Sequence, residues 1–327
     1  MPLRESDLEN AIPLWDELAG AVPQLINHSE NHTFLFSAPH GEAYCLRVHR
    51  PDYQSMANIE SELAWLEALH RQTELAIPEP IVGRDGKLLQ RFTTSAGHVH
   101  HAVLFHFIPG HEPSPESNLV DLFSVLGAYA AALHKHVMGW ERPAGFERQA
   151  WTARAILDAD GLWGDWRVAP GVTDAVRDVL DRMQDRLRQR LADYGTGPDR
   201  YGLIHADMRL GNLLVAGDQV SLIDFDDCGL CWFGYDFAAA ISFHETHKAV
   251  PALKAAWLDA YRTIRPFSDR DAEMLDSMVM LRRMALLAWI GSHAETSLAQ
   301  THVQGFAQGT ADLADRYLAG PIWPGIG

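Results

Sequence analysis

The sequence predicts an α+β protein of two lobes, a small strand-rich lobe followed by a larger lobe that is mostly helical. Up to about residue 110 the apolar residues alternate as in strands, apart from one helical interval. Beyond that point they repeat at helical spacing. A stretch rich in Pro and Ser, residues 109–117, separates the two patterns. We therefore expect an N-terminal lobe over residues 1–109 and a C-terminal lobe over residues 110–327.

The N-terminal region reads as strands around a single helix. Strand-like runs at residues 33–37 and 43–49 flank the turn Pro39-His40-Gly41, which predicts a hairpin. Apolar residues at helical spacing between Ile59 and Leu69 predict a helix over residues 55–70. Asp85-Gly86 is a second hairpin signal, and residues 99–108 form a further expected strand.

The C-terminal region reads as helices with one β-hairpin. Asn118 is placed to cap a helix, and residues 174–191 and 272–289 are also helical in pattern. Apolar runs on both sides of Gly217-Asp218 predict two antiparallel strands. With the turn centred on residue 218, Asn212 lies opposite Asp224, and paired side chains share one face about 5 Å apart.

Composition excludes several classes of protein. The net charge of −16 argues against a nucleic-acid-binding protein, because no basic surface is available to displace counterions from phosphates. Three cysteines in 327 residues do not make a disulfide framework. No signal peptide is evident, and no run of 18 apolar residues is present. We expect a cytoplasmic protein with neither nucleic-acid nor membrane partners.

The stretch DFDDCGLC, residues 224–231, allows two readings of a metal site. Its C-x-x-C half, followed by His244 and His247, nearly matches a tetrahedral zinc pattern. Its carboxylates instead indicate a hard cation bound by oxygen. The two histidines are spaced one residue too closely for a zinc finger, and the intervening residues are mostly apolar. We therefore interpret Cys228 and Cys231 as small buried hydrophobic residues and favour the oxygen site.

The residues before the hairpin supply the groups that phosphoryl transfer needs. A metal must neutralise the charge on ATP, and a carboxylate must orient the acceptor hydroxyl. His205, Asp207 and Asn212 occur in the order H-x-D-x-x-x-x-N, and Asp224-Phe225 follows. This is the order of the catalytic loop and the metal-binding aspartate in the protein-kinase fold. An isolated D-x-x-x-x-N is usually only a turn, and the combination makes that interpretation the weaker one.

The whole arrangement resembles the aminoglycoside-phosphotransferase-like kinase family over most of the chain. The run DFDDCGLCWFGYDFA is most similar to the stress-response kinase branch of that family. The resemblance implies a protein-kinase-like bilobal fold. The small lobe would hold an antiparallel sheet and one helix, with ATP and Mg²⁺ (or Mn²⁺) bound between the lobes.

The resemblance also implies roles for individual residues of the catalytic segment. Asp207 corresponds to the catalytic base and His205 to the structural histidine of the loop. Asn212 and Asp224 correspond to the Mg²⁺ ligands. Asp236 corresponds to the buried aspartate that supports the loop from the following helix.

In the N-terminal lobe the resemblance implies the nucleotide-binding residues. Arg47 stands where the family places the cation that grips the α- and β-phosphates, and Glu62 is its expected partner. The backbone around His106 and Ile108 would meet adenine. The turn expected to cover the phosphates contains Ser29, Glu30 and Asn31. The chain lacks a G-x-G-x-x-G loop and has Arg in place of the usual lysine, although Arg can hold phosphate in bidentate fashion. Taken alone, Arg47 and Glu62 are better explained as surface charges on a strand and a helix, and only their order in the chain favours the nucleotide-binding role.

The sequence leaves the identity of the phosphoryl acceptor undecided. Only eleven residues separate Asp224 from Asp236, and A-P-E is absent, which favours a small molecule over a protein substrate. The alternatives are a Ser/Thr protein kinase of the stress-response type and a nucleotide-binding regulator without turnover. Asp226 and Asp227 would favour a cationic or amine-bearing acceptor, unless they serve as caps or contacts around the metal. The sequence names neither the acceptor nor the oligomeric state, and it does not separate ATP from GTP.

Overall fold

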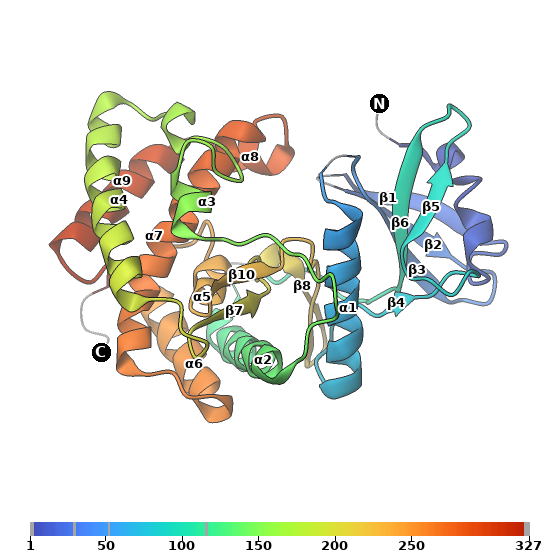
Figure 1. Cartoon of the computed structure of the whole chain (residues 1–327), viewed down its shortest axis with the longest axis horizontal. Helices are drawn as coiled ribbons and strands as arrows, with labels where there is room; N and C mark the ends of the chain where they lie inside the picture. The colour runs from blue at the N-terminus through green and yellow to red at the C-terminus, as the bar shows by residue number, and fades with distance from the viewer. Residues whose placement is uncertain (1–2, 29–30, 52, 115–116, 324–327) are drawn as a thin grey trace. The chain divides into compact units, whose positions relative to one another are not determined.

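The chain folds into two compact units, each of which draws on separate stretches of sequence. The computed structural model describes residues 3–28, 31–51, 53–114 and 117–323 (Figure 1). Unit 1 contains residues 1–111, 142–148 and 214–226, and unit 2 contains residues 112–141, 149–213 and 227–327. No helix in the described ranges is long and apolar enough to cross a bilayer.

Unit 1 is built on one six-stranded antiparallel sheet (Figure 1). The strand order is β1-β2-β3-β6-β4, and β5 pairs with β6 beside this path. The strands are β1 (Val22–His28), β2 (His32–Ser37), β3 (Ala43–Val48), β4 (Pro80–Ile81), β5 (Gln90–Thr93) and β6 (Val99–His106). Two short 3₁₀ helices, η1 (Glu5–Leu8) and η2 (Ile12–Leu14), precede the sheet. Phe34, Phe36 and Leu46 lie in the hydrophobic core that these elements share.

The α-helix that follows β3 in unit 1 confirms the helical pattern seen in the sequence. Helix α1 (Met56–Gln72) begins after Ser55, whose hydroxyl accepts a hydrogen bond from the N–H of Asn58 at 3.1 Å. This side-chain cap satisfies one of the N–H groups that the first turn leaves without a helical partner. Leu63, Leu66 and Leu69 are buried on one side of the helix, as their spacing predicts.

The sheet differs from the sequence-based expectation in two places. Strand β1 was not expected, because Pro23 and several polar residues obscure its pattern. It is an edge strand, where proline is tolerated. Asp85-Gly86 forms a turn but not a hairpin. The two strands that flank it, β4 and β5, both pair with β6 and not with each other.

Unit 2 is mostly helical. Its main helices are α2 (Leu119–Gly139), α4 (Asp174–Tyr194), α6 (Val250–Ile264), α7 (Asp269–Ser292) and α9 (Phe306–Ala319). Shorter helices are α3 (Ala153–Leu157), α5 (Tyr235–Ala240), α8 (Ser297–His302), η3 (Trp166–Val168) and η4 (Leu210–Asn212). The helices expected from Asn118 and at residues 174–191 and 272–289 are thus confirmed. Every residue of α7 from Met274 to Ile290 is buried, so this helix forms the centre of unit 2.

Two short two-stranded sheets complete the fold. Strand β7 (Tyr201–Ile204) pairs antiparallel with β10 (Gly229–Trp232), which contains Cys231 and was not expected as a strand. Strands β8 (Leu213–Ala216) and β9 (Gln219–Leu222) form the expected hairpin.

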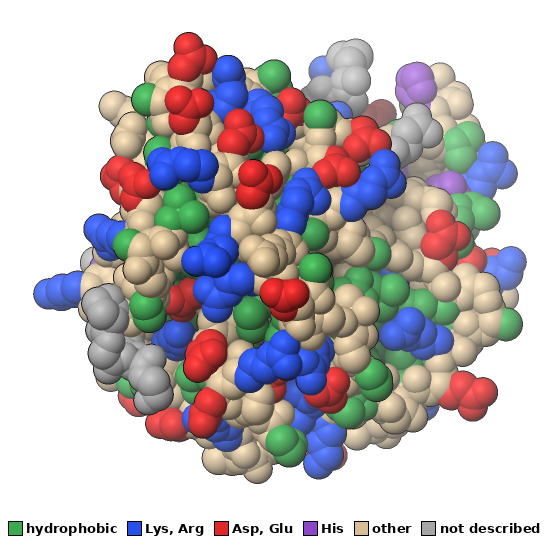
Figure 2. Space-filling model, turned by 60° about the vertical axis from the view of Figure 1, so that its left-hand side comes forward, with side chains coloured by type: hydrophobic (Ala, Val, Ile, Leu, Met, Phe, Trp, Pro, Cys, Tyr) green, Lys and Arg blue, Asp and Glu red, His purple; other side chains and the backbone are tan. Residues whose placement is uncertain are grey.

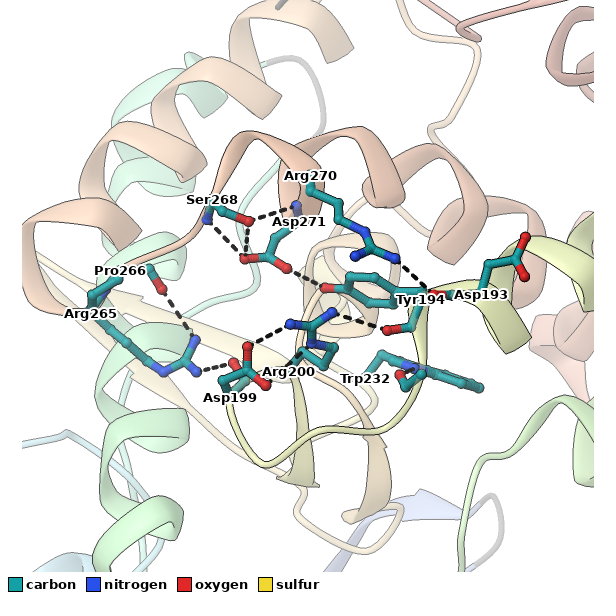
Figure 3. Close-up of polar contacts among 11 residues, drawn as sticks. Asp193, Tyr194, Asp199, Arg200, Trp232, Arg265, Pro266, Ser268, Arg270 and Asp271 are labelled. Carbon is teal, nitrogen blue, oxygen red and sulfur yellow. Dashed lines mark hydrogen bonds and ion pairs between the residues drawn. The ribbon is translucent and has the colours of Figure 1, made fainter.

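A cluster of polar side chains joins the end of α4 to the start of α7 within unit 2 (Figure 3). The hydroxyl of Tyr194 donates to Asp271 Oδ1 at 2.6 Å, and Arg200 Nη1 donates to the carbonyl of Tyr194 at 3.0 Å. Arg265 donates to the carbonyl of Asp199, which precedes β7. Burial raises the pKa of Tyr194, so its hydroxyl stays protonated and acts as a donor. These contacts fix the entry to β7 and therefore the loop that follows it.

Candidate active site

The loop after β7 carries the predicted catalytic residue and is held in place through hydrogen bonds from its backbone N–H groups. Ile204 pairs with Gly229 at the end of the two-stranded sheet, so His205 leaves the strand directly. Ala206 has a φ of 68°, a left-handed conformation that costs energy for a residue other than glycine. The carboxylate of Asp236 accepts hydrogen bonds from the N–H of Ala206 at 2.8 Å and of His205 at 3.3 Å. These bonds hold the unusual turn in place.

Asp236 is itself fixed by a buried histidine that sequence reasoning missed. His134 on α2 places Nε2 3.0 Å from Asp236 Oδ2 and Nδ1 2.9 Å from the hydroxyl of Tyr261. Burial lowers the pKa of His134 and outweighs the opposing effect of Asp236, so the ring is neutral at pH 7. Because a carboxylate only accepts, Nε2 carries the proton and Nδ1 accepts from the tyrosine hydroxyl. The loop is thus supported through α5, α2 and α6.

Asp207 lies among three donors within unit 2. Asn212 Nδ2 donates to Asp207 Oδ2 at 2.7 Å, and Arg209 Nε donates to the same oxygen at 3.2 Å. Arg282 donates to Oδ1. Burial by itself would raise the pKa of the Asp207 carboxyl, but Arg282 and Arg209 hold that pKa below its usual value. Asp207 is therefore ionised at neutral pH, and it is suited to orienting a hydroxyl more than to removing its proton outright.

Arg282 is the most informative residue that the sequence analysis did not single out. Besides Asp207, it contacts the hydroxyl of Ser242 at 3.0 Å and the carbonyl of Ala206. Burial disfavours its charged form, but Tyr235 and Asp207 raise its pKa further, so it stays cationic. Its signal was present in the sequence, because Arg282 and Arg283 interrupt an otherwise apolar stretch of α7.

The expected pairing of Asn212 with Asp224 is not part of the hairpin. Only Gly217 and Asp218 lie between β8 and β9, so the turn is centred half a residue earlier than expected, and the strands end at Leu213 and Leu222. Asn212 is the last residue of η4, and Asp224 follows β9 with a φ of 64°. The register argument was therefore wrong, and the proposed role of the two residues as metal ligands needs other support.

Arg47 and Glu62 do meet within unit 1. Arg47 Nη2 lies 2.8 Å from both oxygens of Glu62, and the two side chains are buried on β3 and α1. Burial disfavours the charge on Arg47, but Glu62, Asp226 and Asp224 more than offset this and raise its pKa. Arg47 Nη1 also lies 4.0 Å from Asp224 Oδ1. Arg47 and Glu62 are therefore not solvated surface charges, which was the alternative interpretation.

The expected hinge lies at the end of β6. The N–H of His106 donates to Glu79 and that of Phe107 to Ala43, so both donors belong to the sheet. Within the described part of the chain, the N–H of Ile108 makes no backbone hydrogen bond. The hinge donor that could meet a nucleotide base is therefore that of Ile108.

The remaining predicted residues fall in different environments. Ser29 and Glu30 lie outside the described residues. Asn31 is buried and donates to Asp226, which is buried as well. Asp227 is half-buried, and its carbonyl accepts from the indole of Trp151 at 2.9 Å. Of the two carboxylates expected to attract an acceptor, only Asp227 is even partly accessible.

The cysteines behave as buried apolar residues. Cys228 and Cys231 are both buried, and the thiol of Cys231 lies 3.3 Å from the carbonyl of Trp151. Burial raises the pKa of the Cys231 thiol well above its usual value.

Asn212 and Asp224 have the donor atoms that Mg²⁺ prefers. Both hydrogens of the Asn212 amide are directed at Asp207, which leaves Oδ1 as the atom of this side chain that can bind a cation. The Asp224 side chain is 48% exposed and so accessible to a hydrated ion. In the described ranges no group of three or more His, Cys, Asp or Glu residues could hold a metal. Each residue by itself offers the kind of oxygen that Mg²⁺ takes, and Mg²⁺ commonly has one or two protein ligands and completes its shell with phosphates and water.

Comparison with known proteins identifies the family. A model described as the phosphotransferase enzyme family matches residues 22–272. The chain belongs to this family. The phosphotransferase is also similar to a solved structure of the microcompartment-associated aminopropanol kinase, with 41% identity and a TM-score of 0.87. That match covers 95% of this chain and 96% of the other.

Two further matches place the phosphotransferase among kinases. It is 27% identical over 280 residues to homoserine kinase from Gluconobacter oxydans (strain 621H), covering 81% of this chain and 82% of the relative. Amicoumacin kinase in complex with AMP-PNP, Ca²⁺ and Ami has the same fold at 20% identity, with a TM-score of 0.74 over 92% of this chain and 90% of that chain. The expected protein-kinase-like α+β fold and the expected ATP-dependent phosphotransferase are thus confirmed. The comparisons do not decide the stress-response branch.

Proposed function

We propose that this phosphotransferase moves the γ-phosphoryl group of ATP to the hydroxyl of a small amino alcohol. The observation that carries the proposal is the 41% identity, spread over 95% of the chain, with a protein named aminopropanol kinase. The more distant relative is named homoserine kinase. Aminopropanol and homoserine both carry an amine and a hydroxyl, which is the acceptor chemistry that the sequence favoured.

The loop after β7 carries the residue that acts in phosphoryl transfer. Asp207 accepts a hydrogen bond from the acceptor hydroxyl and orients its oxygen toward the γ-phosphate. Arg282 and Arg209 keep this carboxylate ionised and fix its direction. Asp236 holds the loop backbone through its bonds to His205 and Ala206.

Unit 1 supplies the nucleotide-binding groups. Arg47, held by Glu62, grips the phosphates, and the backbone at Ile108 receives the adenine. Asn212 and Asp224 supply the oxygen ligands for Mg²⁺ or Mn²⁺. When bound, the metal neutralises charge on the phosphates.

The amine requires a carboxylate that solvent can reach. Asp226 is buried against Asn31, whereas Asp227 is half-buried. Asp227 is therefore the better candidate of the pair expected to attract the amine. An amino alcohol is favoured over an amino acid, because the relative named aminopropanol kinase is 41% identical to this chain and the one named homoserine kinase is 27% identical.

An acceptor screen tests the proposal. ADP release would be measured with ATP and Mg²⁺ against aminopropanol, ethanolamine, homoserine, an aminoglycoside and a Ser/Thr peptide, with a no-acceptor control for autophosphorylation. We expect kcat/KM to be highest for an amino alcohol and the reaction to stop when the metal is chelated. A preference for the peptide would instead establish the protein-kinase alternative. ATP binding without turnover on any acceptor would favour a regulator.

A further inference from the structure

A buried hydrogen bond in unit 1 links two segments that are far apart in sequence. Asn31 Nδ2 donates to Asp226 Oδ2 at 3.0 Å, across 195 residues of chain. The other end of the same amide is also engaged, because Asn31 Oδ1 accepts from the N–H of Arg50 at 3.3 Å. Asn31 and Asp226 are only 8% and 6% exposed. Asn31 is therefore oriented at both ends and does not present its side chain to solvent.

The backbone of Asp226 is held to the helix of unit 1 as well. Its carbonyl accepts from Gln54 Nε2 at 3.4 Å and from the guanidinium of Arg148. Arg148 also donates to the carbonyl of Asn58 in the first turn of α1 at 3.0 Å. The main chain at Asp226 is thus fixed, whereas its side chain depends on Asn31.

The Asp226 carboxylate has few other partners for its charge. Its second oxygen, Oδ1, is buried and makes no hydrogen bond within the described ranges. His49 lies close enough to sense Asp226, but burial and then Arg47 lower the pKa of its ring to about 3, so it is neutral. Asp226 does act on Arg47, whose pKa it helps to raise. The carboxylate therefore supports the phosphate-binding cation while its own orientation rests on one neutral donor.

We propose that Asn31 and Asp226 are a positioning pair that fixes the start of β2 against the segment that begins at Asp224. Asp224 stands two residues before Asp226 in a left-handed conformation, so its direction depends on how the following residues are held. The pair would act by positioning, because both side chains are buried and bonded to protein groups. This inference rests on the proposed function, since it takes Asn31 as part of the phosphate-binding region and Asp224 as a metal ligand. It gives Asp226 a role in binding ATP·Mg²⁺ in place of a role in binding the acceptor.

Reversing the bond provides the test. Asn31→Asp sets two carboxylates against each other. Asp226→Asn leaves two amides, which can still form a hydrogen bond. The double variant restores one carboxylate and one amide, with their positions exchanged. In the double variant the carboxylate at position 31 would still accept from the N–H of Arg50. Affinity for a non-hydrolysable ATP analogue with Mg²⁺ would be measured by calorimetry, together with KM for ATP and kcat. We expect N31D to weaken affinity by about tenfold or more, D226N by about threefold, and the double variant to return within about threefold of wild type.

Asn27→Asp is the matched control, because Asn27 lies on β1 in the same hairpin, is exposed and receives the same chemical change. We expect it to leave affinity within about twofold of wild type, as surface substitutions usually do. If N31D folds poorly, Asn31→Ala removes the donor without adding a charge and should also weaken nucleotide binding. Wild-type affinity in N31D or N31A would overturn the proposal. Single effects that simply multiply in the double variant would overturn it as well.

The result is independent of the acceptor, because nucleotide affinity is measured without one. Coupling between residues 31 and 226 in a protein that phosphorylates no amino alcohol would refute the proposed function and leave the pair intact. If the protein phosphorylates an amino alcohol but residues 31 and 226 show no coupling, the proposed function stands and the positioning pair is refuted. Thermal melting of each variant separates loss of fold from loss of positioning, because a merely structural contact would change stability without a rescued KM for ATP.

Discussion

At the scale of single residues, Asp207 is the group on which transfer should depend most. Asp207→Asn keeps the size of the side chain but removes the charge that orients the acceptor hydroxyl. Because this interaction is needed chiefly in the transition state, kcat should fall by roughly 10² or more while ATP affinity changes little. Steady-state kinetics with the best acceptor measures this, and Asp218→Asn in the exposed turn of the hairpin is the matched control. Wild-type kcat in D207N would remove Asp207 from the mechanism.

Arg282 should set the pH at which Asp207 loses its charge. Burial favours the protonated carboxyl, and Arg282 is the largest opposing influence, so Arg282→Gln must raise the pKa of Asp207. In the wild type the Asp207 carboxyl has a lowered pKa, so the ionised form persists and kcat/KM should hold on the acid side of neutrality. In R282Q the acid limb of the profile should move to higher pH.

Arg283→Gln is the control for this shift. Arg283 neighbours Arg282 on the same helix and is also buried, but its partners are Glu245, Thr310 and the carbonyl of Phe306. R283Q should lower stability and leave the acid limb in place. A profile for R282Q that coincides with the wild type would show that Arg282 does not tune Asp207.

At the scale of elements, local signals predicted most of what the chain forms. Ser55 and Asn118 both act as side-chain caps where the sequence placed helix starts. Strands that lack a strong local pattern were missed, namely β1 with Pro23 and the four-residue strands β7 and β10. The predicted register of the hairpin was wrong by one residue, because that prediction rested only on the assumed centre of the turn. Contacts such as Arg282 with Asp207, 75 residues apart, depend on tertiary packing that no local pattern encodes.

The close packing of α2 on α6 should depend on a single glycine. A Cβ at Gly127 of α2 would lie 2.2 Å from the carbonyl oxygen of Trp257 on α6, so Gly127→Ala forces the helices apart. Overpacking of this kind should lower the free energy of unfolding by about 1–3 kcal/mol, measured by urea denaturation. Gly139→Ala on the same helix is the control, because a Cβ there meets nothing within 4 Å. Equal stability of the two variants would contradict this account of the contact.

At the scale of the whole molecule, net charge bears on the acceptor. The chain carries 43 acidic and 27 Lys or Arg residues. On the face drawn in Figure 2, acidic and basic side chains are interspersed, so the excess negative charge is not gathered there. From Asp224 to His247, by contrast, there are five carboxylates and no Lys or Arg. Asp226, Asp236 and Glu245 are buried, so Asp224 and Asp227 are the carboxylates of this segment that a small molecule can meet.

A cationic acceptor should therefore bind in a salt-dependent way. Partly exposed carboxylates attract positive charge, and added salt screens this attraction over about 10 Å at 0.1 M. KM for an amino alcohol should rise with ionic strength while kcat changes little, and Asp227→Asn should raise KM more than it lowers kcat. A neutral diol of similar size, assayed in parallel, should show no salt dependence of KM. If KM for the amino alcohol were equally independent of salt, the acidic segment would have no part in attracting the acceptor, and the amine would have to be recognised by neutral groups.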